Sequence, residues 1–220
     1  QILLLLLCYI AASCANQHVG SCAPNVAAGG GHCLRGGGAD HATAKPPPPP
    51  SLPAGTVRNN FAPASSRDTL IFGSSRPGFS PESEVPGAVE DSDVTAWATE
   101  MKDKGIKRVV CLLKTSELQF YKTPLQEQMK AAGLVWTSAS LDNPSIILAA
   151  FREADERGER LAVHCSGGVY RTGLALGLWL CSKHGLSPEA AAREVLEAAA
   201  AHKAVRNVNT AKLAALLSGG

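Results

Sequence analysis

The chain has 220 residues, with 21 Lys and Arg against 19 Asp and Glu and a formal net charge of +2 at pH 7. This near balance, together with only 5% aromatic residues, gives no basis for a nucleic-acid or membrane-surface protein. No apolar run reaches the roughly 18–20 residues that span a bilayer, and the seven Cys contain no Cys-x-x-Cys pair, so neither a transmembrane protein nor a structural zinc site is indicated.

Residues 1–15 are similar to a secretory signal peptide. Residues 2–12 form an apolar core, and the small residues Ser13, Cys14 and Ala15 follow it. This length suits a signal peptide and is too short for a membrane anchor. Because the chain starts with Gln1, we expect it to be a fragment that lacks the charged start of such a peptide. The alternative is a buried helix of an incomplete domain.

Residues 16–67 are predicted to be disordered. Residues 1–67 contain one acidic residue, Asp40, but 8 of the 21 Gly and 8 of the 14 Pro. Such a stretch buries too little apolar surface to offset its ordering entropy. Its scattered Arg, Ser and Ala also resemble an organellar transit peptide, as in the two-part presequences of algae with complex plastids. We therefore expect a plastid location, and the alternative is a secretory or endomembrane protein with a plain linker.

Strand and helix signals alternate from about Asp68 to Gly220. Apolar runs predict strands at 69–72, 108–113, 134–139 and 161–163. Helices are predicted at 93–104, 124–132, 145–157, 172–184, 188–202 and 209–217, with Asp93, Ser145 and Ser187 as N-caps and Gly105 and Gly133 as stops. This order predicts one α/β domain over residues 68–220, with a mainly parallel sheet flanked by helices.

The segment 161–173 (LAVHCSGGVYRTG) carries the chemistry, because it joins the last predicted strand to the most apolar helix. Cys165 and Arg171 enclose five residues there. A strand–loop–helix turn points successive N–H groups inward as an anion site, and Gly167 and Gly168 permit the backbone that this requires. The N–H groups and the Arg171 guanidinium favour a thiolate at Cys165 and can hold phosphate oxygens. A thiolate below a bound phosphate is a nucleophile directed at phosphorus.

This segment resembles the signature loop of the protein tyrosine phosphatase superfamily, His-Cys-x-x-Gly-x-x-Arg-Ser/Thr, and matches it at every defined position. The domain from Asp68 to Leu217 is most similar to the small dual-specificity branch. The resemblance implies a phosphomonoesterase that needs no metal or other cofactor and acts on phosphoprotein through a phosphocysteine. It also implies that Thr172 donates a hydrogen bond to the sulfur and that His164 supports the loop. The implied phosphate-binding residues are Ser166, Gly167, Gly168, Val169, Tyr170 and Arg171.

The general acid is predicted from the order of elements. In the dual-specificity branch, an Asp on a loop after a strand protonates the leaving oxygen. Asp142 holds that place here, 23 residues before Cys165, although the loop between them is shorter than usual. The alternative is that Asp142 only forms an Asp-Asn-Pro turn. Weaker candidates for the acid are Glu117, Glu153 and Asp155.

Two departures from the family pattern leave questions open. Tyr170 replaces a small residue before the Arg, and its ring either closes over the pocket rim or packs outside it. The region 205–210 lacks the Gln that positions water in many relatives, so Asn207 or Asn209 either takes this role or caps a helix. The alternative function is a phosphate-binding pseudophosphatase or interaction module with negligible turnover, and a sulfurtransferase or arsenate reductase is a third reading.

Overall fold

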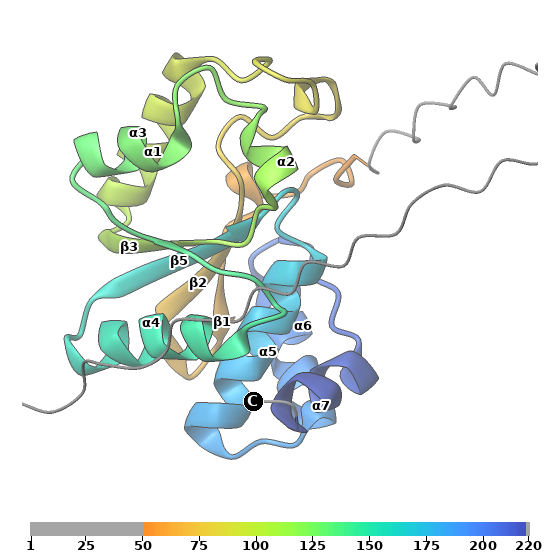
Figure 1. Cartoon of the computed structure of the whole chain (residues 1–220). Coiled ribbons are helices and arrows are strands. Elements are labelled where there is room, and N and C mark those ends of the chain that lie inside the picture. The colour runs from red at the N-terminus through yellow and green to blue at the C-terminus, as the bar shows by residue number, and fades with distance from the viewer. Residues whose placement is uncertain (1–50, 219–220) are drawn as a thin grey trace, which may run out of the picture. The chain divides into compact units, whose positions relative to one another are not determined.

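The sheet at the centre of the computed structural model has five strands in the order β1-β2-β5-β3-β4 (Figure 1). The structure describes residues 51–218, so the signal-like segment and most of the transit-like one lie outside it. The strands are β1 (Ala62–Ser65), β2 (Asp68–Ser75), β3 (Ile106–Cys111), β4 (Val135–Ser138) and β5 (Arg160–Cys165). β1 runs antiparallel to β2 and every other neighbouring pair is parallel, which confirms the predicted α/β class.

Helices cover both faces of the sheet, as predicted (Figure 1). They are α1 (Asp91–Asp103), α2 (Thr115–Leu118), α3 (Leu125–Ala131), α4 (Pro144–Glu156), α5 (Tyr170–His184), α6 (Pro188–Ala201) and α7 (Thr210–Ser218), with short 3-10 turns η1 (Arg58–Asn60) and η2 (Pro81–Ser83). One buried cluster joins the sheet to α1 and α3 through Trp97, Met101 and Met129. The other joins it to α4, α5, α6 and α7.

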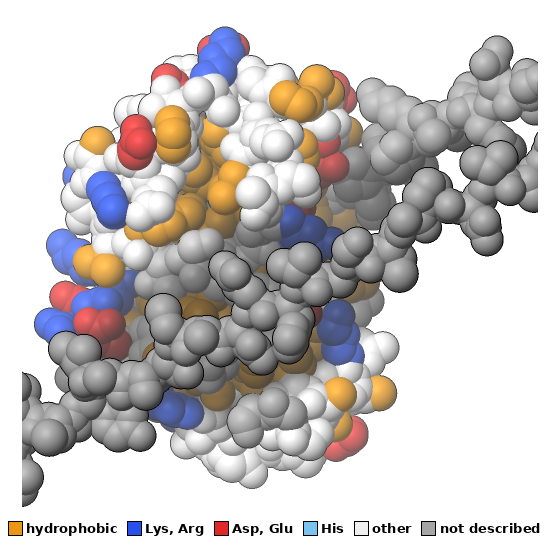
Figure 2. All heavy atoms as spheres, in the orientation of Figure 1, with side chains coloured by type: hydrophobic (Ala, Val, Ile, Leu, Met, Phe, Trp, Pro, Cys, Tyr) orange, Lys and Arg blue, Asp and Glu red, His pale blue; other side chains and the backbone are white. Residues whose placement is uncertain are grey.

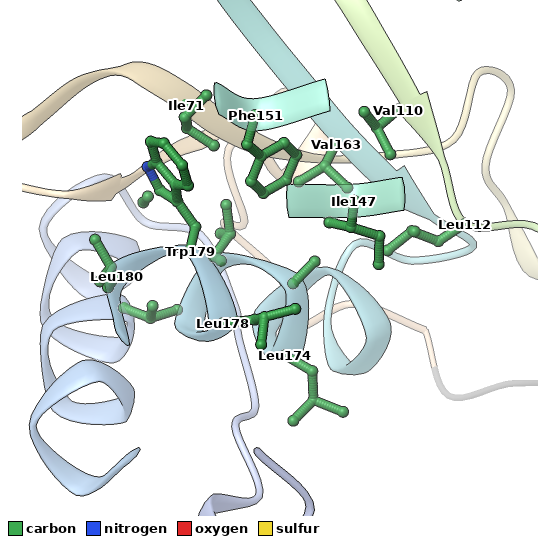
Figure 3. Close-up of a cluster of buried hydrophobic side chains, with 14 of the residues drawn as sticks. Ile71, Val110, Leu112, Ile147, Phe151, Val163, Leu174, Leu178, Trp179 and Leu180 are labelled. Atoms are coloured by element: carbon green, nitrogen blue, oxygen red, sulfur yellow. The ribbon is translucent and has the colours of Figure 1, made fainter. Parts of the chain in front are cut away.

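The second cluster fixes the helix that follows the signature segment. Figure 3 shows side chains of the sheet, of α4 and of α5 meeting there, with Phe151 and Trp179 among them. The two rings lie edge to face with centroids 5.8 Å apart. The Trp179 indole donates a hydrogen bond of 2.6 Å to the buried Asp68 carboxylate. Because α5 is buried along most of its length, its N-terminus is held firmly against the end of β5.

The predicted start of the folded domain at residue 68 is wrong. β1 pairs with β2 from Ala62↔Gly73 to Ser65↔Asp68, and Ala62 and Ala64 are fully buried. The strand escapes sequence analysis because it has four residues and contains Pro63, which is tolerated only where its missing N–H is not needed. An antiparallel edge strand of this kind gives little apolar signal of its own.

Two of the predicted N-caps also differ from the structure. α1 begins at Asp91 with Glu90 as its N-cap, rather than after Asp93, and α4 begins at Pro144 with Asn143 as its N-cap, rather than after Ser145. Pro144 fits the first helical position because its fixed φ and missing N–H cost nothing there. The Ser187 cap is confirmed, since its hydroxyl accepts from the Ala190 N–H. No helix between residues 51 and 218 is long and apolar enough to cross a bilayer.

Candidate active site

Cys165 is the last residue of β5, and α5 begins five residues later at Tyr170. The loop between them turns sharply at Gly168, whose φ is +73° and where an added Cβ would lie 2.5 Å from the Ser74 carbonyl oxygen. Only glycine fits both conditions. The strands on either side of β5 are β2 and β3, so the carboxyl end of β5 lies in the middle of the sheet. The fold therefore presents Cys165 from the central strand of the sheet.

The loop has the backbone arrangement of an anion site. The Ser166 carbonyl accepts from the Arg76 N–H at 2.8 Å, and the Gly167 carbonyl accepts from the Asn60 side chain at 2.8 Å. Within residues 51–218, by contrast, no N–H group of the loop 166–169 donates a hydrogen bond to another backbone group. Carbonyls held outward and free N–H groups at a helix N-terminus are the features that bind phosphate.

The Cys165 sulfur lies at the base of this loop and is almost covered, with 4% of the residue exposed. The Thr172 hydroxyl, which is fully buried, donates a hydrogen bond of 3.2 Å to the sulfur. A hydrogen bond of this kind stabilises the ionised sulfur relative to the thiol.

Arg171 is oriented by the carboxylate of Glu117, which sequence analysis considered only as a candidate for the general acid. Its Nη1 and Nη2 each donate to one oxygen of Glu117 at 2.6 Å, and Nη1 also donates to the Leu112 carbonyl at 2.7 Å. A guanidinium has five N–H groups, so the Nε–H and one Nη2–H stay free on a single edge. That edge forms the planar fork that holds two oxygens of a phosphate.

Glu117 is therefore unsuited to be the general acid. Burial disfavours its charge, but the Arg171 hydrogen bonds and the Lys114 N–H outweigh burial and keep the pKa of Glu117 below its ordinary value. The same pairing overcomes burial at Arg171 and raises the pKa of its guanidinium. Glu153 is bound to Arg108 and Asp155 to Lys183 on other parts of the surface.

Asp142 lies in the cleft that opens beside Arg171. The cleft has a volume of about 1010 Å³ and is lined by the loops after β3 and β4, together with Arg171 from α5 and Lys212 from α7. The Asp142 carboxylate is exposed and accepts a hydrogen bond of 2.8 Å from the Ser140 hydroxyl. The structure thus brings Asp142 and Arg171 to one cavity.

His164 is buried behind the loop and does not reach the cleft. Burial lowers the pKa of His164 to about 4, so the imidazole is neutral at pH 7. Its Nδ1 lies 3.4 Å from the Cys165 carbonyl oxygen, and the rings of Trp97 and Trp136 flank it at centroid distances of 5.8 and 6.1 Å. These contacts fit a supporting role for the loop and exclude proton donation to a bound substrate.

The segment after β2 packs on the loop and was missed by sequence analysis. The Ser166 hydroxyl donates to the Glu84 carboxylate at 2.8 Å. The Phe79 ring lies so close to Gly167 that an added Cβ would stand 3.1 Å from it. The fully buried Arg76 guanidinium donates to the Ser83 hydroxyl at 2.7 Å. The available signal was the string RPGF at residues 76–79, directly after the strand β2 that neighbours β5.

The residues that depart from the family pattern lie at the edge of the signature loop and at the start of α7. Tyr170 is 60% exposed. The Asn207 N–H donates to the Val169 carbonyl at 3.3 Å, so the Asn207 backbone contacts the loop. Asn209 accepts a hydrogen bond of 2.8 Å from the Lys212 N–H at the start of α7. Of the two alternatives for Asn209, this contact corresponds to capping of a helix.

Asn60 connects the missed β1 region to the loop, and its replacement by Ala should weaken both fold and activity. The buried Asn60 side chain donates to the Gly167 and Val205 carbonyls and accepts from the Val205 N–H. Leaving such groups unpaired costs roughly 1–3 kcal/mol. We expect a melting temperature lowered by several degrees and a several-fold loss of activity, measured by calorimetry and phosphatase assay.

The matched control for this change is Asn59→Ala. Asn59 also has a positive φ, 54° against 47° at Asn60, so both substitutions carry the same backbone strain. The Asn59 side chain donates to Glu100 and not to the loop. Equal losses of activity in the two variants would show that Asn60 has no particular connection to the site.

These features together define a cysteine-dependent phosphatase domain of the dual-specificity type. Residues 85–216, more than half of the chain, match the family model PTP-SAK, the "Swiss Army Knife protein, DSP-PTPase phosphatase domain". The chain belongs to this family. No curated protein sequence matches it significantly.

Solved structures with the same fold are distant in sequence. Tk-PTP in its active form is 20% identical, with a TM-score of 0.51 over 73% of this chain and 95% of that one. A kinase associated phosphatase with serine at its catalytic cysteine is 16% identical, with a TM-score of 0.54 over 71% and 89%. PTPMT1 in complex with PI(5)P is 16% identical, with a TM-score of 0.52 over 72% and 95%. At these identities the likeness supports the fold.

Proposed function

We propose that this chain hydrolyses phosphate monoesters of proteins through a phosphocysteine. The observation that carries the proposal is the arrangement of Cys165, Thr172 and Arg171: a nearly covered sulfur with a hydroxyl donor at 3.2 Å, below free N–H groups and beside a guanidinium fixed by a carboxylate. A phosphoryl group bound on the loop would lie between the sulfur and the cleft. Hydrogen-bond donors that are already oriented, in a site that excludes water, stabilise the charge that develops in the transition state.

The reaction proceeds in two displacements at phosphorus. The Cys165 thiolate forms an S–P bond as the P–O bond breaks, and the leaving oxygen takes the electron pair and a proton from Asp142. Water then attacks the phosphocysteine, Asp142 accepts its proton, and the S–P electron pair returns to the sulfur. The Thr172 hydroxyl favours this departure by its hydrogen bond to the sulfur. The products are the dephosphorylated substrate and orthophosphate.

A protein side chain is the substrate that the site supports best. The cleft is wide, and the loop 166–170 has no Lys of the kind that relatives use for polyanionic inositol lipids. On the uncovered parts of the face shown in Figure 2, acidic and basic side chains are interspersed.

The alternative, a phosphate-binding module with negligible turnover, rests on two observations. The Asp142 side chain is anchored only through Ser140 within residues 51–218, and the region 205–210 has no Gln to position water. Such a module would bind phosphate on Arg171 and the loop but would not turn over.

Asp142→Asn in the full chain tests the acid and separates the two functions. With a phosphotyrosine peptide, whose leaving group needs a proton, we expect kcat to fall about 10²–10³-fold. With 2,4-dinitrophenyl phosphate, whose leaving group departs unprotonated, kcat should fall less than tenfold. Asp155→Asn on α4 is the control and should match the wild type. An equal loss on both substrates would exclude Asp142 as the acid, and a folded wild-type chain that binds vanadate without turnover would establish the binding module.

A further inference from the structure

Arg206 is a buried guanidinium that has no carboxylate partner within residues 51–218. It lies in the loop between α6 and α7 and is 7% exposed. Its Nη1 donates to the Val205 carbonyl at 2.9 Å and its Nη2 to the Asn60 carbonyl at 2.8 Å, while Nε has no partner within residues 51–218. Arg108, which is equally buried, is bound by both Glu153 and Glu159.

An unpaired buried cation is costly, and its persistence calls for an anion in the same place. Burial lowers the pKa of Arg206 to about 10, which still leaves it protonated at neutral pH. The charge of Cys165 acts in the opposite direction and favours the guanidinium cation.

The packing around Gly73 places Arg206 next to the sulfur's hydrogen-bond donor. A Cβ added to Gly73 would stand 2.7 Å from Arg206 Nη2 and 2.7 Å from Thr172 Cγ2. The Arg206 Nη2 and Thr172 Cγ2 atoms therefore both pack against the same side of Gly73, which pairs with Val163 of β5. The absence of a side chain at position 73 lets the guanidinium approach Thr172, whose hydroxyl donates to Cys165.

Several other charged groups lie near Cys165. Arg171 is paired with Glu117, His164 is neutral, and burial raises the pKa of the Cys111 thiol to about 12, so that it is uncharged. Glu84 accepts from Ser166, and Asp142 lies in the cleft. Arg76 is a second fully buried guanidinium without a carboxylate partner within residues 51–218, but it donates to three backbone carbonyls and to the Ser83 hydroxyl and lies against the Phe79 and Phe120 rings.

We infer that Arg206 is a positioning residue that stabilises the Cys165 thiolate from the buried side of the phosphate loop. The inference rests on the proposed function, because it concerns the nucleophile of that reaction. Arg171 faces the substrate, whereas Arg206 acts on the sulfur without touching the substrate. Its charge favours the thiolate both before attack and when the sulfur leaves the phosphocysteine.

Arg206→Met in the full chain tests this inference, with Arg206→Lys as the variant that keeps the charge. The readout is the pH dependence of Cys165 alkylation by iodoacetamide, located by mass spectrometry. A nearby opposite charge shifts an ionisation by about one unit or more, so the midpoint of the alkylation profile should rise by roughly one unit in the Met variant. In Arg206→Lys the midpoint should rise by less than half as much. Arg108→Met, at an equally buried arginine, should leave the midpoint unchanged.

The result separates this role from a structural one. Arg206→Met keeps most of the side-chain volume but leaves the Val205 and Asn60 carbonyls without their donor, so its fold is checked by calorimetry, and Arg206→Gln, which keeps an N–H donor, is the second neutral variant. An unchanged midpoint in a folded neutral variant would overturn the inference. Because alkylation needs no turnover, a raised midpoint in a chain without phosphatase activity would support Arg206 and reject only the proposed function.

Discussion

Cys165→Ser should lower kcat for a phosphotyrosine peptide by at least about 10⁴-fold, the largest effect expected of any single substitution in this chain. The serine hydroxyl is not ionised at neutral pH, and the N–H groups, Arg171 and Thr172 are arranged to stabilise a charged sulfur. The loop keeps its phosphate-binding groups, so vanadate should still bind to the variant. Steady-state kinetics and calorimetric titration with vanadate check the two expectations.

Cys181→Ser is the matched control for this loss. Cys181 is also buried, and it lies on α5, which begins at the same loop, but burial raises the pKa of its thiol and nothing in the cleft contacts it. Its variant should keep activity within a few-fold of the wild type. Turnover by Cys165→Ser at more than a hundredth of the wild-type rate would mean that the sulfur does not form the covalent intermediate.

The signature loop was predictable from sequence because its determinants are local. The apolar run of β5, Gly168 at a positive φ and the first turn of α5 follow one another within the thirteen residues 161–173, so periodicity and turn chemistry are sufficient to place Cys165, Arg171 and Thr172. The α/β class followed from the same alternation of apolar runs and helical patterns.

The supports of the loop were not predictable, because they come from distant segments. Sequence analysis considered Glu117 only as a weaker candidate for the general acid, and only the fold brings it to 2.6 Å from Arg171. Asn60 and Arg206 approach each other across 146 positions of the chain. Asn60 also lies in a Gly- and Pro-containing stretch that composition alone assigns to disorder, and its pairing with the loop requires β1 to have formed. Long-range pairing of this kind leaves no periodic signal.

Arg171→Lys should lower kcat/KM by about 10³-fold with little change in the melting temperature. The guanidinium uses one edge on Glu117 and Leu112 and keeps the other edge for two phosphate oxygens. An ammonium group is a point charge and cannot make both pairs at once, so transition-state stabilisation by a planar fork is lost. Glu117→Gln should give a smaller loss, about tenfold, because the amide offers a single acceptor and orients Arg171 less firmly.

The comparison with Arg108→Lys decides whether this effect belongs to the site. Arg108 also binds carboxylates with two of its nitrogens, at 2.6 and 3.0 Å, but it lies outside the cleft. Its replacement should lower stability slightly and leave kcat/KM unchanged. Arg171→Lys could instead keep more than a tenth of the wild-type kcat/KM. That result would mean that Glu117 and Leu112 do not orient the guanidinium to hold two phosphate oxygens. If it lost activity and failed to bind vanadate while remaining folded, the free edge of Arg171 would be established as the phosphate fork.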